Sequence, residues 1–193
     1  MMQSSVHYLG PPGSHTHQAC LNHFPQSPLS PCASIDQVLN QTSQSSDQNR
    51  LGFVPIENST FGPVLETLDS LNSHSLLIID QVQMPIRHSF LSNASVGLEE
   101  SDLRLIDKVY SHPQVSDLCV DLIQQALGQC AQWLRNHVPH AEQIPCASTS
   151  KAAQLASADP CGAAICSFIC SELYNLRILF TDIQDASCTP FVR

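Results

Sequence analysis

Short apolar runs alternate with amphipathic segments along the whole chain, and this alternation is what most restricts the fold. Short runs rich in Val, Ile, Leu and Tyr are typical of buried strands, whereas apolar residues three and four positions apart are typical of helices. Strands that alternate with helices predict an α/β fold with a mostly parallel sheet, or with a pair of such sheets. The strands are expected at 6–9, 51–56, 75–80, 82–91, 107–110 and 162–166, and the segment AEQIPCA (141–147) ends directly before Ser148.

Helices are expected after several of these strands. Pro63 suits the first turn of a helix, because proline has its backbone angle already set for that position. Val64, Leu65, Leu68 and Leu71 then recur at helical spacing and form one apolar stripe. Further helices are expected from Ser14, around 38–39, after Pro113, from Ser148 and over 171–180.

Hydroxyl and amide side chains follow four of the expected strands, where a helix is expected to begin. In open α/β sheets, ligands bind beyond the carboxyl ends of the strands. A helix N-terminus at that edge offers backbone N–H groups and about half a positive charge, which suits a carboxylate or a phosphate. Each hydroxyl taken by itself also suits the capping of its own helix. The four groups are Ser14, then Asn58, Ser59 and Thr60, then Ser111, and then Ser148, Thr149 and Ser150.

Composition limits the kind of partner. The formal net charge is -9, and the 8 Lys and Arg residues are scattered along the chain without a basic run. Neither nucleic acid nor an anionic membrane surface is therefore expected as a partner. The apolar stretches are too short to cross a bilayer, and the first residues do not have the pattern of a secretory signal. With so few cations, the four polar groups favour a small-anion site built from amides and hydroxyls.

Cysteine and histidine pairs are the residues that could suggest a metal site. The chain has 9 Cys and no CxxC pair, and Cys161, Cys166 and Cys170 lie among small apolar residues, where packing is the expected role. His15 and His17 have no acidic neighbours to complete a ligand set, so a local role at a turn or helix start is expected. A metal site is therefore not predicted.

Nine short motifs point to one family, because they occur in its order and spacing. The motifs are YLGPPGSHTHQA (8–19), VPIENSTFGPV (54–64), MPIRHSFL (84–91), YSHPQ (110–114), ASTSKAA (147–153), AAICS (163–167), LYNLRIL (173–179), IQD (183–185) and CTPFVR (188–193). In this respect the chain resembles the prephenate dehydratase family over nearly its whole length. The blocks VPIENS, SHPQ and IQD are specific in combination, although each is weak alone.

The resemblance implies a fold and an activity. The family's catalytic domain, to which residues 1–193 correspond, has two α/β lobes like a type 2 periplasmic binding protein, with the active site in the inter-lobe cleft. One subdomain would hold residues 1 to about 80 plus 173–193, and the other about 81–172. The family converts prephenate to phenylpyruvate in phenylalanine biosynthesis, in the cytoplasm and without a cofactor, and a homodimer is a further expectation. The signature segments of the family's regulatory domain do not occur in the sequence, so phenylalanine feedback is not carried over.

The resemblance also assigns roles to residues. Thr189 matches the Thr of a Thr-Arg-Phe motif and is the predicted catalytic residue, which either donates a strong hydrogen bond or relays a proton. Glu57 and Phe191 are supporting candidates; Glu57 either orients its neighbours or favours the positive end of a helix. For His88 and His112 a packing or hinge role is as well supported as an acid role, so neither is counted as catalytic. The predicted substrate-binding residues are Asn58, Ser59, Thr60, Ser111, Ser148, Thr149 and Ser150.

The chain departs from the family pattern at polar positions of the expected cleft. Pro190 stands where the motif has Arg, and Arg is suited to holding a carboxylate with two hydrogen bonds. Leu118 and Ala147 replace residues that are often polar, and GPPG replaces GPEG. These changes leave two functions open: a dehydratase with lowered activity, or an inactive relative that binds a small aromatic or carboxylate ligand.

Overall fold

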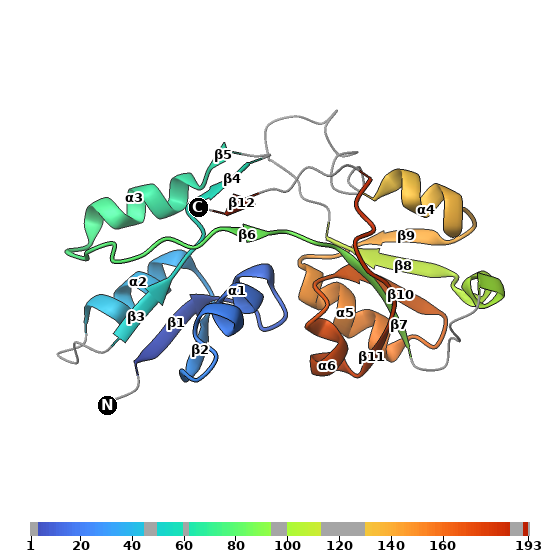
Figure 1. The fold of residues 1–193 in the computed structure, drawn as a ribbon, viewed down its shortest axis with the longest axis horizontal. Helices are drawn as coiled ribbons and strands as arrows, with labels where there is room; N and C mark the ends of the chain where they lie inside the picture. The colour runs from blue at the N-terminus through green and yellow to red at the C-terminus, as the bar shows by residue number, and fades with distance from the viewer. Residues whose placement is uncertain are drawn as a thin grey trace. The chain divides into compact units, whose positions relative to one another are not determined.

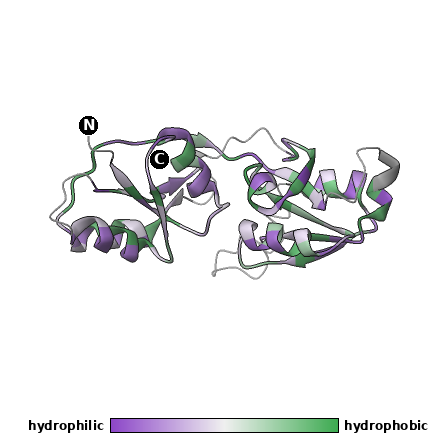
Figure 2. Ribbon diagram, turned by 90° about the horizontal axis from the view of Figure 1, so that it is seen from below, coloured by the Kyte–Doolittle hydropathy of each residue, from purple (hydrophilic) through white to green (hydrophobic). Residues whose placement is uncertain are grey.

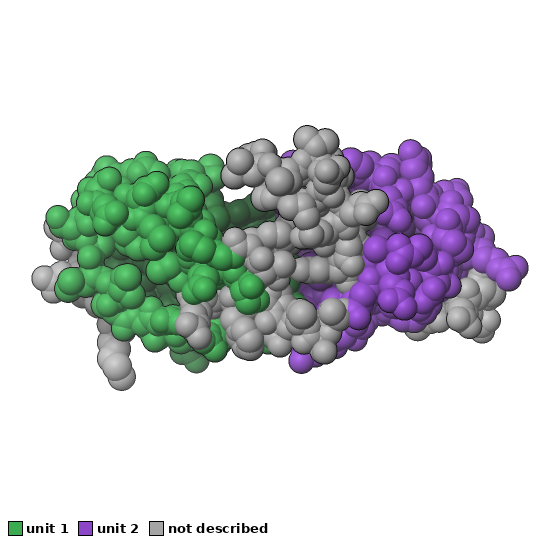
Figure 3. All heavy atoms as spheres, turned by 90° about the horizontal axis from the view of Figure 1, so that it is seen from above, with its two compact units in different colours: residues 1–86, 189–193 green, residues 87–188 purple. Residues whose placement is uncertain are grey.

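The protein consists of two compact units (Figure 3), one formed by residues 1–86 and 189–193 and the other by 87–188. Strands alternate with helices in both units (Figure 1), which confirms the α/β prediction. The boundary differs from the predicted one, because 173–188 belong to unit 2, where β11 (Leu176–Phe180) pairs with β7 (Ser89–Asn93). The computed structural model describes residues 4–44, 50–59, 62–93, 100–112, 130–185 and 191–192.

Unit 1 contains a parallel sheet of strand order β2-β1-β3, with β1 at its centre. Val6 and Tyr8 project from β1 and are buried together with Cys20 of the following helix. Two of the predicted strands, near 6–9 and 51–56, are found in this sheet. The elements are β1 (Ser5–Leu9), α1 (His15–His23), β2 (Leu29–Cys32), α2 (Ile35–Ser43) and β3 (Arg50–Phe53).

A second sheet of unit 1 has the order β5-β4-β12-β6 and is antiparallel throughout. Its strands are short: β4 (Glu57–Asn58), β5 (Gly62–Pro63), β6 (Met84–Pro85) and β12 (Phe191–Val192). β12 follows unit 2 in the sequence and pairs with two strands of unit 1.

Three predictions for this part of unit 1 were wrong. Pro63 lies in β5 and not in a helix, because the residues after β4 turn back into a hairpin. The helix α3 (Leu65–Ser73) therefore begins two residues later, and Leu65 of the expected apolar stripe is 66% exposed. No strand forms over 75–80, since 75–83 is extended without ladder partners among the described residues.

Unit 2 is built on a five-stranded sheet of order β11-β7-β10-β8-β9. β8, β9 and β10 are parallel, and β7 and β11 are antiparallel to their neighbours. β10 is buried at every residue, as the sequence predicted for 162–166. The other elements of unit 2 are the 3-10 helix η1 (Glu100–Leu105), β8 (Lys108–Ser111), α4 (Ala131–His137), β9 (Glu142–Pro145), α5 (Thr149–Ala158), β10 (Gly162–Cys166) and α6 (Cys170–Tyr174).

The helix predicted over 171–180 was wrong in its second half. The helix α6 ends at Tyr174 because Asn175 takes the left-handed conformation, with φ 52°, that commonly ends a helix. Leu176 and Arg177 are then buried and exposed in turn, as in a strand, and β11 pairs with β7. The change of direction at Asn175 thus supplies an edge strand to the sheet of unit 2.

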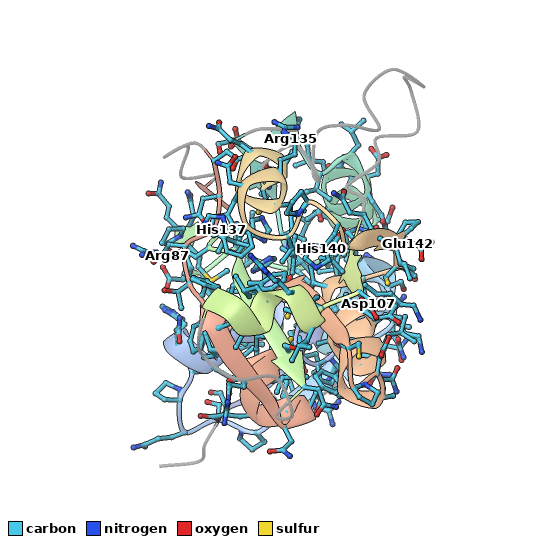
Figure 4. All side chains as sticks on the ribbon, turned by 90° about the vertical axis from the view of Figure 1, so that its right-hand side faces the viewer. Arg87, Asp107, Arg135, His137, His140 and Glu142 are labelled. Atoms are coloured by element: carbon cyan, nitrogen blue, oxygen red, sulfur yellow. The ribbon has the colours of Figure 1, made fainter. Side chains whose placement is uncertain are left out.

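The helices of both units carry hydrophobic and hydrophilic residues (Figure 2), and α1, α4, α5 and α6 bury side chains in the core of their own unit. In unit 2, Phe90 of β7 packs against Trp133 of α4, and Trp133 stacks on His137 at 4.3 Å between ring centroids. Figure 4 shows Arg135 and His137 at different heights on α4, with Glu142 at the start of β9. Within the described ranges, no helix has both the length and the apolar character needed to cross a bilayer.

Asp159 of unit 2 makes stability depend on pH. Burial opposes its ionisation, but the Tyr110 hydroxyl at 2.9 Å, the Cys161 N–H at 3.1 Å and the Lys108 ammonium lower its pKa below the ordinary value. A carboxyl whose pKa is lowered by folding contributes stability above its unfolded pKa, and the contribution is lost as the pH falls. The hydrogen bond from Tyr110 is therefore expected to matter at neutral pH and not in acid.

We expect Tyr110→Phe to lower the free energy of unfolding by about 1 kcal/mol at pH 7, and by less as the pH falls through the pKa of Asp159. Urea unfolding of variant and wild type at neutral and acidic pH measures both differences. Tyr174→Phe is the matched control, because the Tyr174 hydroxyl contacts the neutral hydroxyl of Ser150. A pH-independent loss for Tyr110→Phe would contradict the assignment.

Candidate functional site

In unit 2 the carboxyl ends of three parallel strands lie at one edge of the sheet. β8 ends at Ser111, whose side chain is buried, and its carbonyl accepts a hydrogen bond from the Cys146 N–H at 2.7 Å. β10, on the other side of β8, is followed by the buried Ser167. The predicted residues Ser111 and Ser148 therefore approach the same edge, since β8 and β9 run in register from Lys108 to Ser111.

The N-terminus of α5 lies at this edge, two residues beyond Cys146. Ser148 is its N-cap, and the Ser148 hydroxyl accepts a hydrogen bond from the Lys151 N–H at 3.0 Å. Thr149 begins the helix and is half-buried. The first turn of a helix concentrates backbone N–H groups and partial positive charge. This part of the predicted site combines a capped helix start with the ends of two parallel strands.

Ser150 has its hydroxyl turned to the interior of unit 2. The side chain is 3% exposed and hydrogen-bonds the Tyr174 hydroxyl. Tyr174 lies at the end of α6, so this bond links α5 to α6. The sequence grouped Ser150 with Ser148 and Thr149 as a binding residue. Because its side chain is buried, a role in holding the N-terminus of α5 in place fits it better.

His112 follows Ser111, and the structure fixes the orientation of its ring. The Nδ1 atom lies 2.9 Å from the Cys146 carbonyl oxygen. A carbonyl oxygen only accepts hydrogen bonds, so Nδ1 carries the proton and Nε2 is the acceptor in the neutral ring. This bond also links β8 to the segment that leads into α5.

In unit 1 the predicted residues lie on the β4–β5 hairpin. Glu57 and Asn58 form β4 and are half-buried, and Ser59 in the turn is exposed. Val192 of β12 is the register partner of Asn58. The strand that follows the predicted catalytic residue therefore lies beside the PIENS motif. Thr60, Thr189 and Pro190 lie outside the described residues, as do Leu118 and the helix predicted after Pro113.

Sequence reasoning missed a buried threonine that supports this hairpin. Thr67 of α3 is fully buried, and its hydroxyl donates a hydrogen bond to the Pro55 carbonyl at 2.7 Å. Pro55 precedes Glu57 by two residues, so the bond ties α3 to the segment leading into β4. The partner lies 12 residues away in the sequence, and a helix pattern alone carries no signal for it.

The IQD motif has a structural role in unit 2. Ile183 is buried in the core, and the Gln184 side chain accepts a hydrogen bond from the His88 N–H at 3.1 Å. The Asp185 carboxylate accepts two hydrogen bonds from the start of α4, from the Gln132 N–H at 2.6 Å and the Trp133 N–H at 2.8 Å. A carboxylate at a helix N-terminus interacts favourably with the partial positive charge there, and it accepts hydrogen bonds from backbone N–H groups that have no partner within the helix. The sequence did not predict this cap, because it joins residues more than 50 positions apart.

The other polar candidates are placed as follows. Ser14 caps α1, and its hydroxyl accepts a hydrogen bond from the His17 N–H at 3.1 Å, as expected for a helix start. Cys166 and Cys170 are buried, as predicted, but Cys161 is exposed. A hydrogen bond with Cys170 and burial raise the pKa of the Cys166 thiol, so it is not a reactive thiolate. Within the described ranges, no group of three His, Cys, Asp or Glu side chains is arranged to hold a metal.

Comparison with known proteins places the chain in a family. The family model for prephenate dehydratase matches residues 6–193. The chain belongs to the prephenate dehydratase family. The resemblance predicted from the motifs is thereby confirmed.

Individual relatives agree with this assignment. A bifunctional chorismate mutase/prephenate dehydratase from Pseudomonas aeruginosa is 34% identical over 181 residues, which are 93% of this chain and 45% of the relative. The corresponding protein of Aquifex aeolicus is 34% identical over 182 residues, 94% of this chain and 45% of the relative. The chain thus spans about half the length of the curated relatives it matches.

A solved structure supports the same fold. The prephenate dehydratase of Arthrobacter aurescens, crystallised in complex with L-Phe, has a TM-score of 0.75 and 27% identity to this chain. The match covers 97% of this chain and 58% of that one. The prephenate dehydratase fold therefore extends over nearly all of the 193 residues.

Proposed function

We propose that this protein is a prephenate dehydratase, a carbon–oxygen lyase that forms phenylpyruvate in phenylalanine biosynthesis. The observation that carries the proposal is the family match over residues 6–193, which includes the motifs of the candidate site. The carboxyl edge of the unit 2 sheet supports it, since Ser111 and the start of α5 lie there. Those groups suit a substrate with carboxylates.

The reaction requires one proton and stabilisation of the charge that develops on the substrate. Prephenate dianion and a proton give phenylpyruvate, carbon dioxide and water. The electron pair of the broken bond to the ring carboxylate enters the ring, which becomes aromatic as the ring hydroxyl leaves. A positioned donor at the departing hydroxyl accelerates such a step by about 10²–10⁴-fold. Correct orientation of both leaving groups provides the rest of the acceleration.

Roles for the residues follow from this chemistry. Thr189 donates a hydrogen bond to the departing hydroxyl or relays the proton to it, and Asn58, Ser59 and Thr60 bind the substrate from the first lobe. Ser111, Ser148 and Thr149 bind it from the second lobe, and Ser150 holds the start of α5 through Tyr174. Glu57 and Phe191 support the first group. The active site is proposed in the inter-lobe cleft of a two-lobed, periplasmic-binding-protein-like domain, where the two groups close on the substrate.

The setting follows from the same family. We propose that the enzyme acts in the cytoplasm, as a homodimer, on prephenate as its small-molecule substrate and without a cofactor. The net charge of -9 fits neither a nucleic-acid partner nor an anionic membrane surface. Sedimentation equilibrium tests the homodimer, because a monomer mass at all concentrations would contradict it.

Incubation of the purified chain with prephenate tests the proposed activity. Phenylpyruvate formation above the uncatalysed background is expected, and calorimetric titration with prephenate measures binding separately. Binding without turnover would favour the alternative of an inactive relative that binds a small carboxylate ligand, for which Pro190 in place of Arg is the specific argument. If the chain neither binds prephenate nor converts it, both functions are contradicted.

A further inference from the structure

The backbone of Cys146, directly after β9, is held by two consecutive residues of the neighbouring segment. Its N–H donates a hydrogen bond to the Ser111 carbonyl at 2.7 Å, and its carbonyl accepts one from the His112 Nδ1 at 2.9 Å. The first bond continues the parallel ladder of β8 and β9, in which Ser111 is the register partner of Pro145. The second bond comes from a side chain, although it lies where the ladder would continue.

The proline at position 113 explains why a side chain makes this bond. In a parallel ladder every second residue bonds the neighbouring strand through both its N–H and its carbonyl. Along this segment Asp107 and Ser111 belong to that series, and their carbonyls accept hydrogen bonds from the other strand at 2.8 and 2.7 Å. The next member is residue 113, whose N–H would donate to the Cys146 carbonyl. Pro113 has no backbone N–H, and the ring of His112 supplies the donor in its place.

The Cys146 carbonyl lies two residues before the N-cap of α5. The Ser148 hydroxyl accepts a hydrogen bond from the Lys151 N–H, and the Ser148 carbonyl accepts one from the Ala152 N–H, both at 3.0 Å. A single residue, Ala147, separates this capped turn from Cys146. The place at which Cys146 is held therefore determines where the first turn of α5 begins relative to the end of β8.

A second contact holds the same turn from another side. Ser150 hydrogen-bonds the Tyr174 hydroxyl of α6, so the start of α5 is fixed both to β8 and to α6. The first turn of a helix presents backbone N–H groups and partial positive charge to an anion. Because hydrogen bonds weaken steeply with distance and misalignment, a small displacement of this turn weakens its grip on a carboxylate.

We propose that His112 is a positioning residue for substrate binding. Its ring replaces the ladder donor that Pro113 lacks, and it thereby holds the N-terminus of α5 in place for a carboxylate of the substrate. This role rests on the proposed dehydratase function. The ring donates through Nδ1 whether or not Nε2 also carries a proton, so the bond persists in both states of the ring. His112 then acts on substrate binding and not as the proton donor of the chemical step.

His112→Leu and His112→Asn test this role as a matched pair. Both side chains branch at Cγ, but only asparagine has an N–H donor close to the position of Nδ1. The leucine variant is expected to raise KM for prephenate by about three- to tenfold, the order expected for one lost hydrogen bond, with kcat nearly unchanged. Asparagine is expected to restore most of the loss and to keep the shape of the pH profile of kcat. A fall in kcat at unchanged KM in both variants would indicate an acid role and overturn the proposal.

Hydrogen exchange measures the position of α5 without reference to activity. The amides of Cys146, Lys151 and Ala152 are expected to exchange about three- to tenfold faster in the leucine variant and at the wild-type rate in the asparagine variant. His137→Leu is the control, because the His137 Nδ1 also lies 2.8 Å from a carbonyl, that of Trp133, but at the end of α4. Unchanged exchange in His112→Leu, or an equal change in His137→Leu, would overturn the proposal.

A double variant tests the replacement of the ladder donor. Pro113→Ala in the His112→Leu background returns a backbone N–H to position 113, and slower exchange of the three amides than in His112→Leu alone is expected. No recovery would overturn the replacement. A wild-type chain that neither binds nor converts prephenate would contradict the proposed function, and with it the role of His112 in substrate binding. The exchange rates would in that case still show or exclude that His112 holds α5.

Discussion

Replacing Thr189 by alanine is expected to lower the rate of phenylpyruvate formation by about 10²–10⁴-fold, the usual contribution of a positioned proton donor. The departing hydroxyl of prephenate needs a proton, and alanine has no group that donates one. Binding should change little, because the interaction strengthens as the carbon–oxygen bond breaks. Steady-state kinetics should therefore show a fall in kcat with a nearly unchanged KM.

Thr189→Ser is the matched control for this prediction. Serine keeps the hydroxyl and removes a methyl group, so it should retain most of the activity that alanine loses. The pairing of β12 with β4 and β6 involves Phe191 and Val192. Equal rates for the alanine variant and the wild type would exclude Thr189 as the catalytic residue.

Pro190→Arg is expected to raise activity by about 10- to 150-fold. Arginine stands at this place in the family motif, and a hydrogen-bonded charge pair with a carboxylate contributes about 1.5–3 kcal/mol. Proline supplies neither a charge nor a backbone N–H, and it restricts residue 189 to extended conformations. The gain should appear in kcat/KM for prephenate.

Two further variants at position 190 separate the effect of the added charge from the effect of removing the backbone constraint of proline. Pro190→Ala releases the constraint on residue 189 without adding a charge, and Pro190→Lys adds a charge without the planar fork of arginine. If carboxylate binding is the cause, activity should rise in the order alanine, lysine, arginine. A similar rise in all three variants would instead identify the proline ring as the cause, and no rise in any would contradict a loss of function at this position.

Local signals predicted the parts of the fold that depend on neighbouring residues. Ser14 and Ser148 precede apolar periodic segments, and both cap a helix with a hydrogen bond three residues along the chain. The run GAAIC predicted a fully buried strand, and β10 is buried throughout. In these cases the pattern and the stabilising contact lie within one stretch of sequence.

The predictions from sequence were wrong where contacts between residues far apart in the sequence determine the structure. LRILF follows a helical segment without a proline or glycine, and its pairing with β7 across unit 2 makes it a strand. The cap of α4 by Asp185 and the hydrogen bond from Thr67 to Pro55 likewise join separate segments. In the candidate site, the hydroxyls were proposed from the sequence, whereas the orientation of His112 and the inward hydrogen bond of Ser150 depend on contacts with Cys146 and Tyr174.

The position of β12 also determines the order in which the two units are completed during synthesis of the chain. Residues 87–188 of unit 2 are continuous in the chain, whereas the second sheet of unit 1 needs Val192 beside Asn58. Chains emerge from the ribosome N-terminal end first, so residues 87–188 of unit 2 are complete before unit 1 receives β12. Asn58 thus gains its β12 neighbour only after translation has passed residue 192, and nascent unit 1 carries an incomplete sheet until then.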